Sequence, residues 1–281
     1  MDFDFRSRIE DESVNGSQAN SLLLILGLTA LFILPTLFYT FLYVIFSSVD
    51  QDLLTYIAYF FGYGTYIAVL FKILGKDKIK KIIKGFDLNN LYTAFIFAII
   101  LYLASTLTST LVNVIFKDVG SNANQESLDQ SMVNYPIIVS IFSVIFAPIV
   151  EELVFRFTIF KPLAQKNKVL AYCVSVLTFA GIHFISSLSV LMTDLANPEL
   201  TQEIAYSSFF DDLKTLPIYI VAALVLTFSY DLNKNISTNI LIHAFYNLSQ
   251  VVLMLIAQKI IENMPEISST VSSITTYLFN F

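Results

Sequence analysis

Residues 136–160 read PIIVSIFSVIFAPIVEELVFRFTIF, and the only charged side chains in this run are Glu151, Glu152 and Arg156. A hydrocarbon core about 30 Å thick is crossed by roughly 20 apolar residues of helix, because every backbone amide must be paired in lipid. The run therefore predicts a membrane-spanning helix that carries three ionisable groups. Pro148 has no backbone N–H, so we expect a bend just before the two glutamates.

The rest of the chain has the same apolar character. Of its 281 residues 56% are hydrophobic and 14% are charged, and the mean hydropathy of +0.71 excludes a water-soluble globule. Further spans are predicted at 21–46, 53–74, 91–116, 169–192, 216–232 and 236–261, and residues 268–281 could form an eighth element. We expect an all-α, polytopic transmembrane bundle of seven to eight helices, with residues 1–20 as a polar cytoplasmic tail and residues 21–281 as the transmembrane domain.

The distribution of charged residues indicates which partners are disfavoured and how the chain is oriented in the membrane. A net charge of -6 without a basic stripe argues against nucleic-acid binding, and the single Cys173 cannot form an internal disulfide. If the N-terminus is cytoplasmic, twelve of the 16 Lys and Arg residues fall on inner segments and three on outer ones. The sequence thus predicts a multi-pass protein of the cell membrane with a cytoplasmic N-terminus, and residues 120–134 as an outer loop.

Both histidines of the protein, His183 and His243, lie in predicted spans, within the segments FAGIH (179–183) and HAFYN (243–247). An ionisable group at the bilayer centre costs about 2.5 to 3.5 kcal/mol on insertion scales. Imidazole is also the side chain whose charge changes near neutral pH. Such costly groups indicate a functional site inside the membrane.

Helical spacing separates the roles of these polar residues. Residues four apart share one face of a helix, so Glu152 can pair with Arg156, and His243 can act together with Asn247. Glu151 points in another direction and has no cation on its own helix. It is the carboxylate left free for chemistry.

The motifs Glu-Glu-x-x-x-Arg, Phe-x-x-x-His and His-x-x-x-Asn, in this order on hydrophobic segments, resemble the family of CAAX prenyl proteases and bacteriocin-processing enzymes (CPBP, or Abi). The likeness covers about residues 136–261, which would form a protease-like core. It implies an intramembrane endopeptidase in which a glutamate activates water. The resemblance assigns Glu151 as this base, and it assigns the rest of the site to Glu152, Arg156, His183, His243 and Asn247.

Two mechanisms are open for such a site. In one, His183, His243 and Glu151 bind a divalent metal such as zinc, which lowers the pKa of its water to about 7. In the other, Glu151 and His183 deprotonate water, while His243 and Asn247 donate hydrogen bonds to the oxyanion. The second version is favoured, because asparagine is a poor zinc ligand and a good donor.

The expected partners are the lipid bilayer and a peptide or protein substrate. Estimated depths place the polar groups in the inner half of the bilayer, so cleavage is expected near the cytoplasmic face. One alternative is a non-catalytic membrane scaffold or bacteriocin self-immunity protein of the same fold. Another is an ion-coupled transporter, although no inverted repeat is evident in the sequence.

Overall fold

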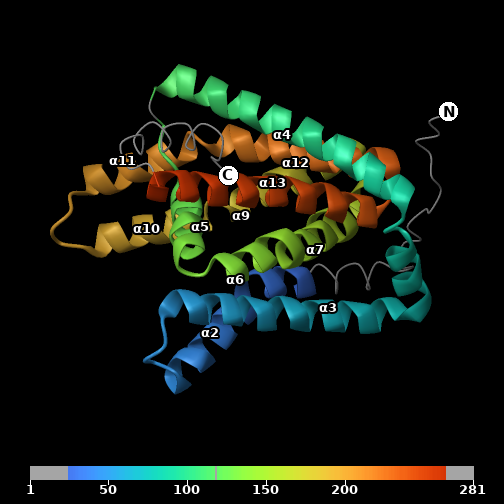
Figure 1. The fold of residues 1–281 in the computed structure, drawn as a ribbon, viewed down its shortest axis with the longest axis horizontal. Coiled ribbons are helices and arrows are strands. Elements are labelled where there is room, and N and C mark those ends of the chain that lie inside the picture. The colour runs from blue at the N-terminus through green and yellow to red at the C-terminus, as the bar shows by residue number, and fades with distance from the viewer. Residues whose placement is uncertain (1–24, 118, 264–281) are drawn as a thin grey trace.

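The computed structural model describes residues 25–117 and 119–263, and Figure 1 shows them as a bundle of helices. Within these ranges the regular elements are helical and no strand occurs. In chain order the elements are η1 (Thr29–Ile33), α2 (Leu34–Ile45), α3 (Gln51–Lys84), α4 (Leu88–Phe116), α5 (Ala123–Asn134), α6 (Pro136–Ile141), η2 (Phe142–Phe146), α7 (Ala147–Glu152), η3 (Leu153–Phe160), α8 (Lys161–Ala164), α9 (Lys168–Ile182), α10 (Ile185–Ala196), α11 (Gln202–Leu213), α12 (Leu216–Asn233) and α13 (Ile236–Asn263).

The described residues contain 6 helices long and apolar enough to cross a membrane, and the bent pair α9 and α10 raises the number to 7. Many large apolar side chains on these helices face outward, as lipid-facing residues do. The prediction of an all-α polytopic membrane bundle is therefore confirmed. The expected tail at residues 1–20 and the possible element at 268–281 lie outside the described residues, and the domain division stays a prediction.

The span that carries both glutamates, Pro136–Ala164, is one continuous helix with two π-helical stretches. In η2 the N–H of Ala147 donates to the carbonyl of Phe142, five residues back, immediately before Pro148. The missing N–H of the proline is thus accommodated by a wider turn. π-Helical turns lie on both sides of α7, which carries the proline and both glutamates.

The fifth span differs from the prediction of one helix over 169–192. It consists of α9 and α10, which meet at an angle of 50°. At the joint the N–H groups of His183 and Phe184 donate to carbonyls three residues back, so the α-helical ladder stops there. The break places His183 at the junction of two helices in the interior of the bundle.

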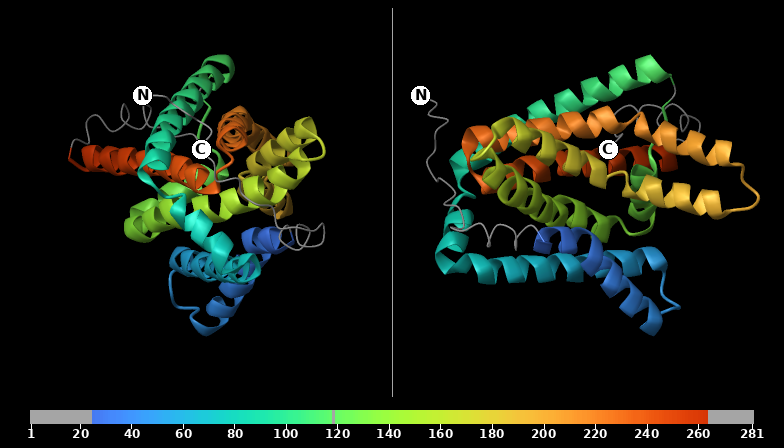
Figure 2. Two further views of the ribbon diagram at one scale, coloured as in Figure 1. Left: turned by 90° about the vertical axis from the view of Figure 1, so that its right-hand side faces the viewer. Right: turned by 180° about the vertical axis from the view of Figure 1, so that it is seen from behind.

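The two ends of the bundle carry opposite charge, and helices α3, α4, α12 and α13 run between them (Figures 1 and 2). One end, where α3 meets α4, α8 meets α9 and α12 meets α13, holds Asp77, Asp87 and Asp231 beside Lys76, Lys78, Lys80, Lys81, Lys84, Lys161, Lys166, Lys168 and Lys234. We call it the basic end. The other, acidic end holds Lys117, Lys214 and Lys259 beside Asp50, Asp52, Glu126, Asp129, Asp194, Glu199, Glu203, Asp211, Asp212 and Glu262.

Helix α5 lies across the acidic end, roughly perpendicular to the spans (Figure 1). Most of the expected outer loop at 120–134 is thus a helix. The side chain of Asn122 caps it by accepting from the N–H of Gln125, and its amide donates to Thr215 at 2.8 Å and to Tyr219 at 3.0 Å. The cap therefore fixes α5 to the start of α12, and α5 also packs on α10.

At the basic end the last turn of α3 contacts the first turn of α13. The hydroxyl of Ser237 donates to the carbonyl of Ile82 at 2.6 Å. A Cβ atom added to Gly85 would lie 2.6 Å from the Ser237 hydroxyl oxygen, so only glycine allows this approach.

Candidate functional site

Glu152 is the centre of a buried polar network. Its side chain is 0% exposed, and its carboxylate accepts from Arg156 Nη1 at 3.1 Å, His243 Nδ1 at 2.9 Å and Asn239 Nδ2 at 2.6 Å. Three donors on two elements therefore converge on one carboxylate. A buried charge is tolerated when it is paired and hydrogen-bonded in this way.

Arg156 is also 0% exposed and is held from three sides. Besides its ion pair with Glu152, its guanidinium carbon lies 4.4 Å from the ring centroid of Phe179, and Nη2 donates to the carbonyl of Ala223 at 3.4 Å. The cation thereby links η3 to α9 and α12 through a carboxylate, an aromatic face and a backbone dipole. The predicted pairing of Arg156 with Glu152 is present.

Glu151 points away from this network, as its position one residue earlier requires. Its Oε2 atom lies 3.9 Å from Nε2 of His243. That separation is too long for a direct hydrogen bond, and it is short enough for one water molecule to contact both atoms. Glu151 is therefore a carboxylate with free acceptor positions beside a histidine.

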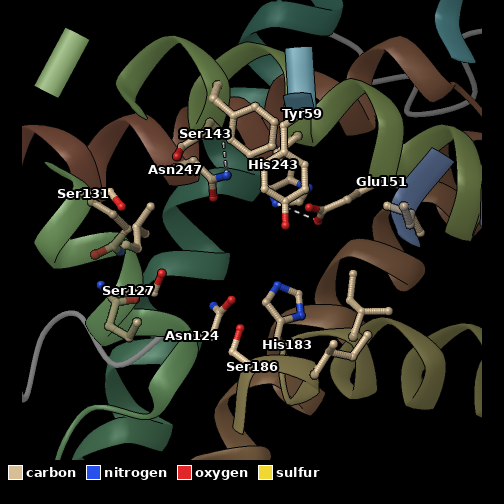
Figure 3. A pocket seen from close by; sticks show the side chains of 18 of the residues that line it. Tyr59, Asn124, Ser127, Ser131, Ser143, Glu151, His183, Ser186, His243 and Asn247 are labelled. Carbon is tan, nitrogen blue, oxygen red and sulfur yellow. Dashed lines mark hydrogen bonds and ion pairs between the residues drawn. The ribbon is translucent and has the colours of Figure 1, made fainter. Parts of the chain in front are cut away.

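His183 lies across the cavity from Glu151 and His243 (Figure 3). Its Nδ1 is 2.9 Å from the carbonyl oxygen of Phe179, which can only accept, so Nδ1 carries the proton and Nε2 is left as the second ring nitrogen of the site. Its ring centroid lies 5.1 Å from that of Phe179 and 4.6 Å from that of Tyr219. Phe179 thus packs beside the imidazole, as their spacing of four residues on one helix allows.

Asn247 lies one turn after His243 on α13. Its Nδ2 donates to the carbonyl of Ser143 in η2 at 2.8 Å (Figure 3). A side-chain amide nitrogen has two hydrogens, so one donor position is left over. The bond to Ser143 holds this amide against the π-helical turn that precedes the glutamates.

A cavity of about 410 Å³ joins these groups, a volume within the usual range for ligand sites. Glu151, His183, His243 and Asn247 line it, so the structure brings together residues from all three motifs. Glu152 and Arg156 do not line it and lie behind its wall. The cavity continues past the start of α3, at Asp52, and past α5 at the acidic end. The cavity therefore extends from these residues toward the acidic end, and the predicted depth of the polar groups in the bilayer stays a prediction.

The predicted metal ligands all line the cavity but are not gathered around one point. In the described ranges no three His, Cys, Asp or Glu side chains lie closely enough together to hold an ion. Nδ1 of each imidazole is engaged, by Phe179 in one case and by Glu152 in the other, which leaves Nε2 as the second nitrogen of each ring, as in metal-bound histidines. The metal version of the site stays a prediction.

Sequence reasoning missed two residues of the site. Asn239 binds the carboxylate of Glu152, and Tyr219 packs on the ring of His183. Asn239 had a detectable signal, because it lies four residues before His243 and therefore shares its helical face. Tyr219 had none, because its contact depends on how α12 packs against α9.

The fold and the site together define a multi-pass α-helical membrane protein with a polar cavity inside the bundle. Residues 133–249 match the family model for type II CAAX prenyl endopeptidase Rce1-like proteins, which confirms the resemblance seen in the three motifs. The chain is also 27% identical over 189 residues to an uncharacterised protein of Mycoplasma capricolum subsp. capricolum, covering 64% of this chain and 48% of that protein. The chain thus spans about half the length of this relative. No solved structure matches the chain.

Proposed function

We propose that this protein is a CAAX protease-like intramembrane endopeptidase of the cell membrane, in which Glu151 activates the water that hydrolyses a peptide bond. The observation that carries the proposal is the contrast between two adjacent glutamates. Glu152 is fully engaged by three donors, whereas Glu151 faces a cavity and lies 3.9 Å from His243. A carboxylate with free acceptor positions at a cavity wall is what a general base requires.

In the proposed reaction a water molecule sits between Glu151 and Nε2 of His243. Glu151 takes a proton from this water as its oxygen forms a bond to the peptide carbonyl carbon, and the carbonyl oxygen becomes an oxyanion. When the tetrahedral intermediate collapses, the carbon–nitrogen bond breaks and Glu151 returns the proton to the departing amine. The water molecule is thereby divided between the two products.

The other residues hold the reacting groups in place. The spare N–H of Asn247 stabilises the oxyanion, and Nε2 of His183 accepts a hydrogen bond from the substrate on the far wall. Glu152 fixes Nδ1 of His243 as a donor, so that Nε2 faces Glu151. This assignment moves the partner of Glu151 from His183, as the sequence predicted, to His243.

We propose the version without a metal, because the imidazoles lie on different walls of the cavity. The full chain in lipid nanodiscs is therefore expected to keep its activity in the presence of EDTA. Loss of activity with EDTA and its return with zinc would contradict this part of the proposal.

The test of the function is hydrolysis of a library of fluorescence-quenched peptides by the full chain in lipid nanodiscs. We expect Glu151→Gln to lower kcat about 10³-fold, the size of a lost general base, without changing the thermal unfolding midpoint by more than a few degrees. Glu262→Gln, an exposed glutamate at the end of α13, is the matched control and should retain full activity.

A folded Glu151→Gln protein with wild-type turnover would contradict the proposal. If the wild-type chain cleaves no peptide and Glu151→Gln also preserves the cellular phenotype, the non-catalytic scaffold is the better description.

A further inference from the structure

The cavity has a second, polar compartment between the glutamates and the acidic end. We call it the outer chamber and define it by Asp52 at the start of α3, Asn124, Gln125, Ser127 and Ser131 on α5, and Gln250 on α13. Figure 3 shows Asn124, Ser127 and Ser131 across the open space from Glu151 and His243. None of these residues takes part in the proposed bond cleavage.

Two glutamines of the outer chamber have unused hydrogen-bonding capacity. Gln125 is 3% exposed, and its Oε1 atom has no hydrogen-bond partner within the described residues, although its Nε2 donates to Asp129. The oxygen and the nitrogen of the Gln250 side chain are buried and also have no partner there. A buried polar group without a partner costs about 1 to 3 kcal/mol, so these atoms favour a ligand that supplies both donors and acceptors. An extended peptide backbone supplies them in alternation.

The negative charge of the cavity lining favours a peptide with positive charge. Asp52 and Glu151 line the cavity, and no lysine or arginine lies among its lining residues. Glu126 and Asp129 on α5 and Asp212 in the last turn of α11 add carboxylates at the same end, and the N–H of Ala123 donates to Asp212 at 3.2 Å. A peptide with lysine or arginine is attracted to this rim, whereas an acidic peptide is repelled.

The orientation of the bundle decides from which side such a peptide arrives. Lysines next to membrane spans are retained on the cytoplasmic side, and they are concentrated at the basic end, which contributes no lysine to the lining of the cavity. The outer chamber lies at the opposite end.

We propose that the outer chamber is a binding site for an extended, lysine- or arginine-containing peptide segment that enters from the extracytoplasmic side. Gln125 accepts a hydrogen bond from its backbone through Oε1, Gln250 donates and accepts through Nε2 and Oε1, and Asp52 selects its charge. The delivery of a scissile bond to Glu151 rests on the proposed function. The side of entry and the binding of the peptide are independent of that function.

The side of entry is tested by cysteine labelling of the full chain in cells. In a Cys173→Ser background, Ser127→Cys on the exposed part of α5 should react with a membrane-impermeant maleimide in intact cells. Lys166→Cys, between α8 and α9, should react only in inverted vesicles. The opposite pattern would overturn the proposal.

Binding is tested separately from cleavage, in the Glu151→Gln background. The probes are two fluorescein-labelled decapeptides of alanine and serine, one with a central Lys-Lys pair and one with Glu-Glu. We expect the lysine peptide to bind at least tenfold more tightly, Gln250→Leu to raise its Kd about tenfold, and Asp52→Asn to reduce the preference for lysine. Gln258→Leu, two turns further along α13 and outside the cavity lining, is the control and should leave Kd unchanged.

The outcomes of this experiment separate the two proposals. Tight binding of the lysine peptide without cleavage by the wild-type chain would contradict the protease assignment and leave the binding site standing. An unchanged Kd in Gln250→Leu, or equal binding of both peptides, would overturn the binding site even if peptides are cleaved.

Discussion

The site has two layers, which contain the adjacent residues Glu151 and Glu152. They differ in contact with the cavity and in hydrogen bonding. The inner layer, formed by Glu152, Arg156 and Asn239, is fully buried, and its carboxylate is matched to donors. The cavity wall, formed by Glu151, His183 and Asn247, faces open space and keeps hydrogen-bonding positions free. Adjacent residues on a helix point about 100° apart, so Glu152 can enter the buried hydrogen-bond network while Glu151 faces the cavity.

Arg156→Met is the most severe way to break the inner layer. Removal of one partner leaves the charge of Glu152 buried and poorly compensated, and we expect the free energy of unfolding to fall by about 3 to 5 kcal/mol. The measurement is denaturation of the purified protein in mixed micelles. Arg156→Met combined with Glu152→Gln should recover part of the loss. Equal stability of the single and double variants would show that no uncompensated charge was involved.

Asn247→Ala tests the cavity wall. We expect kcat to fall about 10²-fold, as when one donor to an oxyanion is lost. The Kd for peptide, measured in the Glu151→Gln background, should change less than twofold. The exposed Asn263→Ala at the end of α13 serves as the control. A rise in Kd that accounts for the whole loss of activity would assign Asn247 to substrate binding instead.

Asn239→Leu tests whether the two layers are coupled. The substitution leaves Glu152 Oε2 without its amide donor, so we expect a loss of about 1 to 3 kcal/mol in unfolding free energy. Asn239 also bonds the carbonyl of Leu226 and the hydroxyl of Ser229, but it does not line the cavity and is connected to the site through Glu152. The pH profile of kcat should therefore also shift, while KM stays constant. An unchanged pH profile together with the stability loss would reduce Asn239 to a purely structural role.

Asp129→Asn gives the smallest expected effect and concerns the acidic end. Burial, with a smaller contribution from Glu126, raises the pKa of Asp129 from 3.8 to about 6, against an opposing hydrogen bond from Gln125. The folded state therefore holds this proton more tightly than the unfolded state, and stability should fall as the pH rises from about 4 to about 6 and stay lower above it. Asp129→Asn should remove this step in thermal unfolding measured across the same pH range. A step of unchanged size in the variant would assign it to another group.

The sequence predicted contacts within one helix better than contacts between helices. Helical periodicity alone puts Arg156 beside Glu152 and Phe179 beside His183, and both pairs are present. The partner of Glu151 could not be predicted in the same way, because it depends on the packing of α13 against α7.

The break in the fifth span was missed for a related reason. Hydropathy predicts one helix over 169–192, whereas the structure has two helices, α9 and α10, that meet at an angle of 50°. Helix α5 was missed as well, because its polar sequence resembles a loop. Its cap at Asn122 is supported by contacts to Thr215 and Tyr219, which are remote in sequence.

The wide turn at Phe142–Phe146 has a consequence for how the helix tolerates a change in length. A π-helical turn holds one residue more than an α-helical turn, so the extra residue is absorbed within the turn and the side chains after it keep their direction. Deletion of one residue within this stretch is therefore expected to restore an ordinary helical turn and to leave Glu151 at the cavity. The directions of the two carboxylates thus do not depend on the length of this apolar stretch.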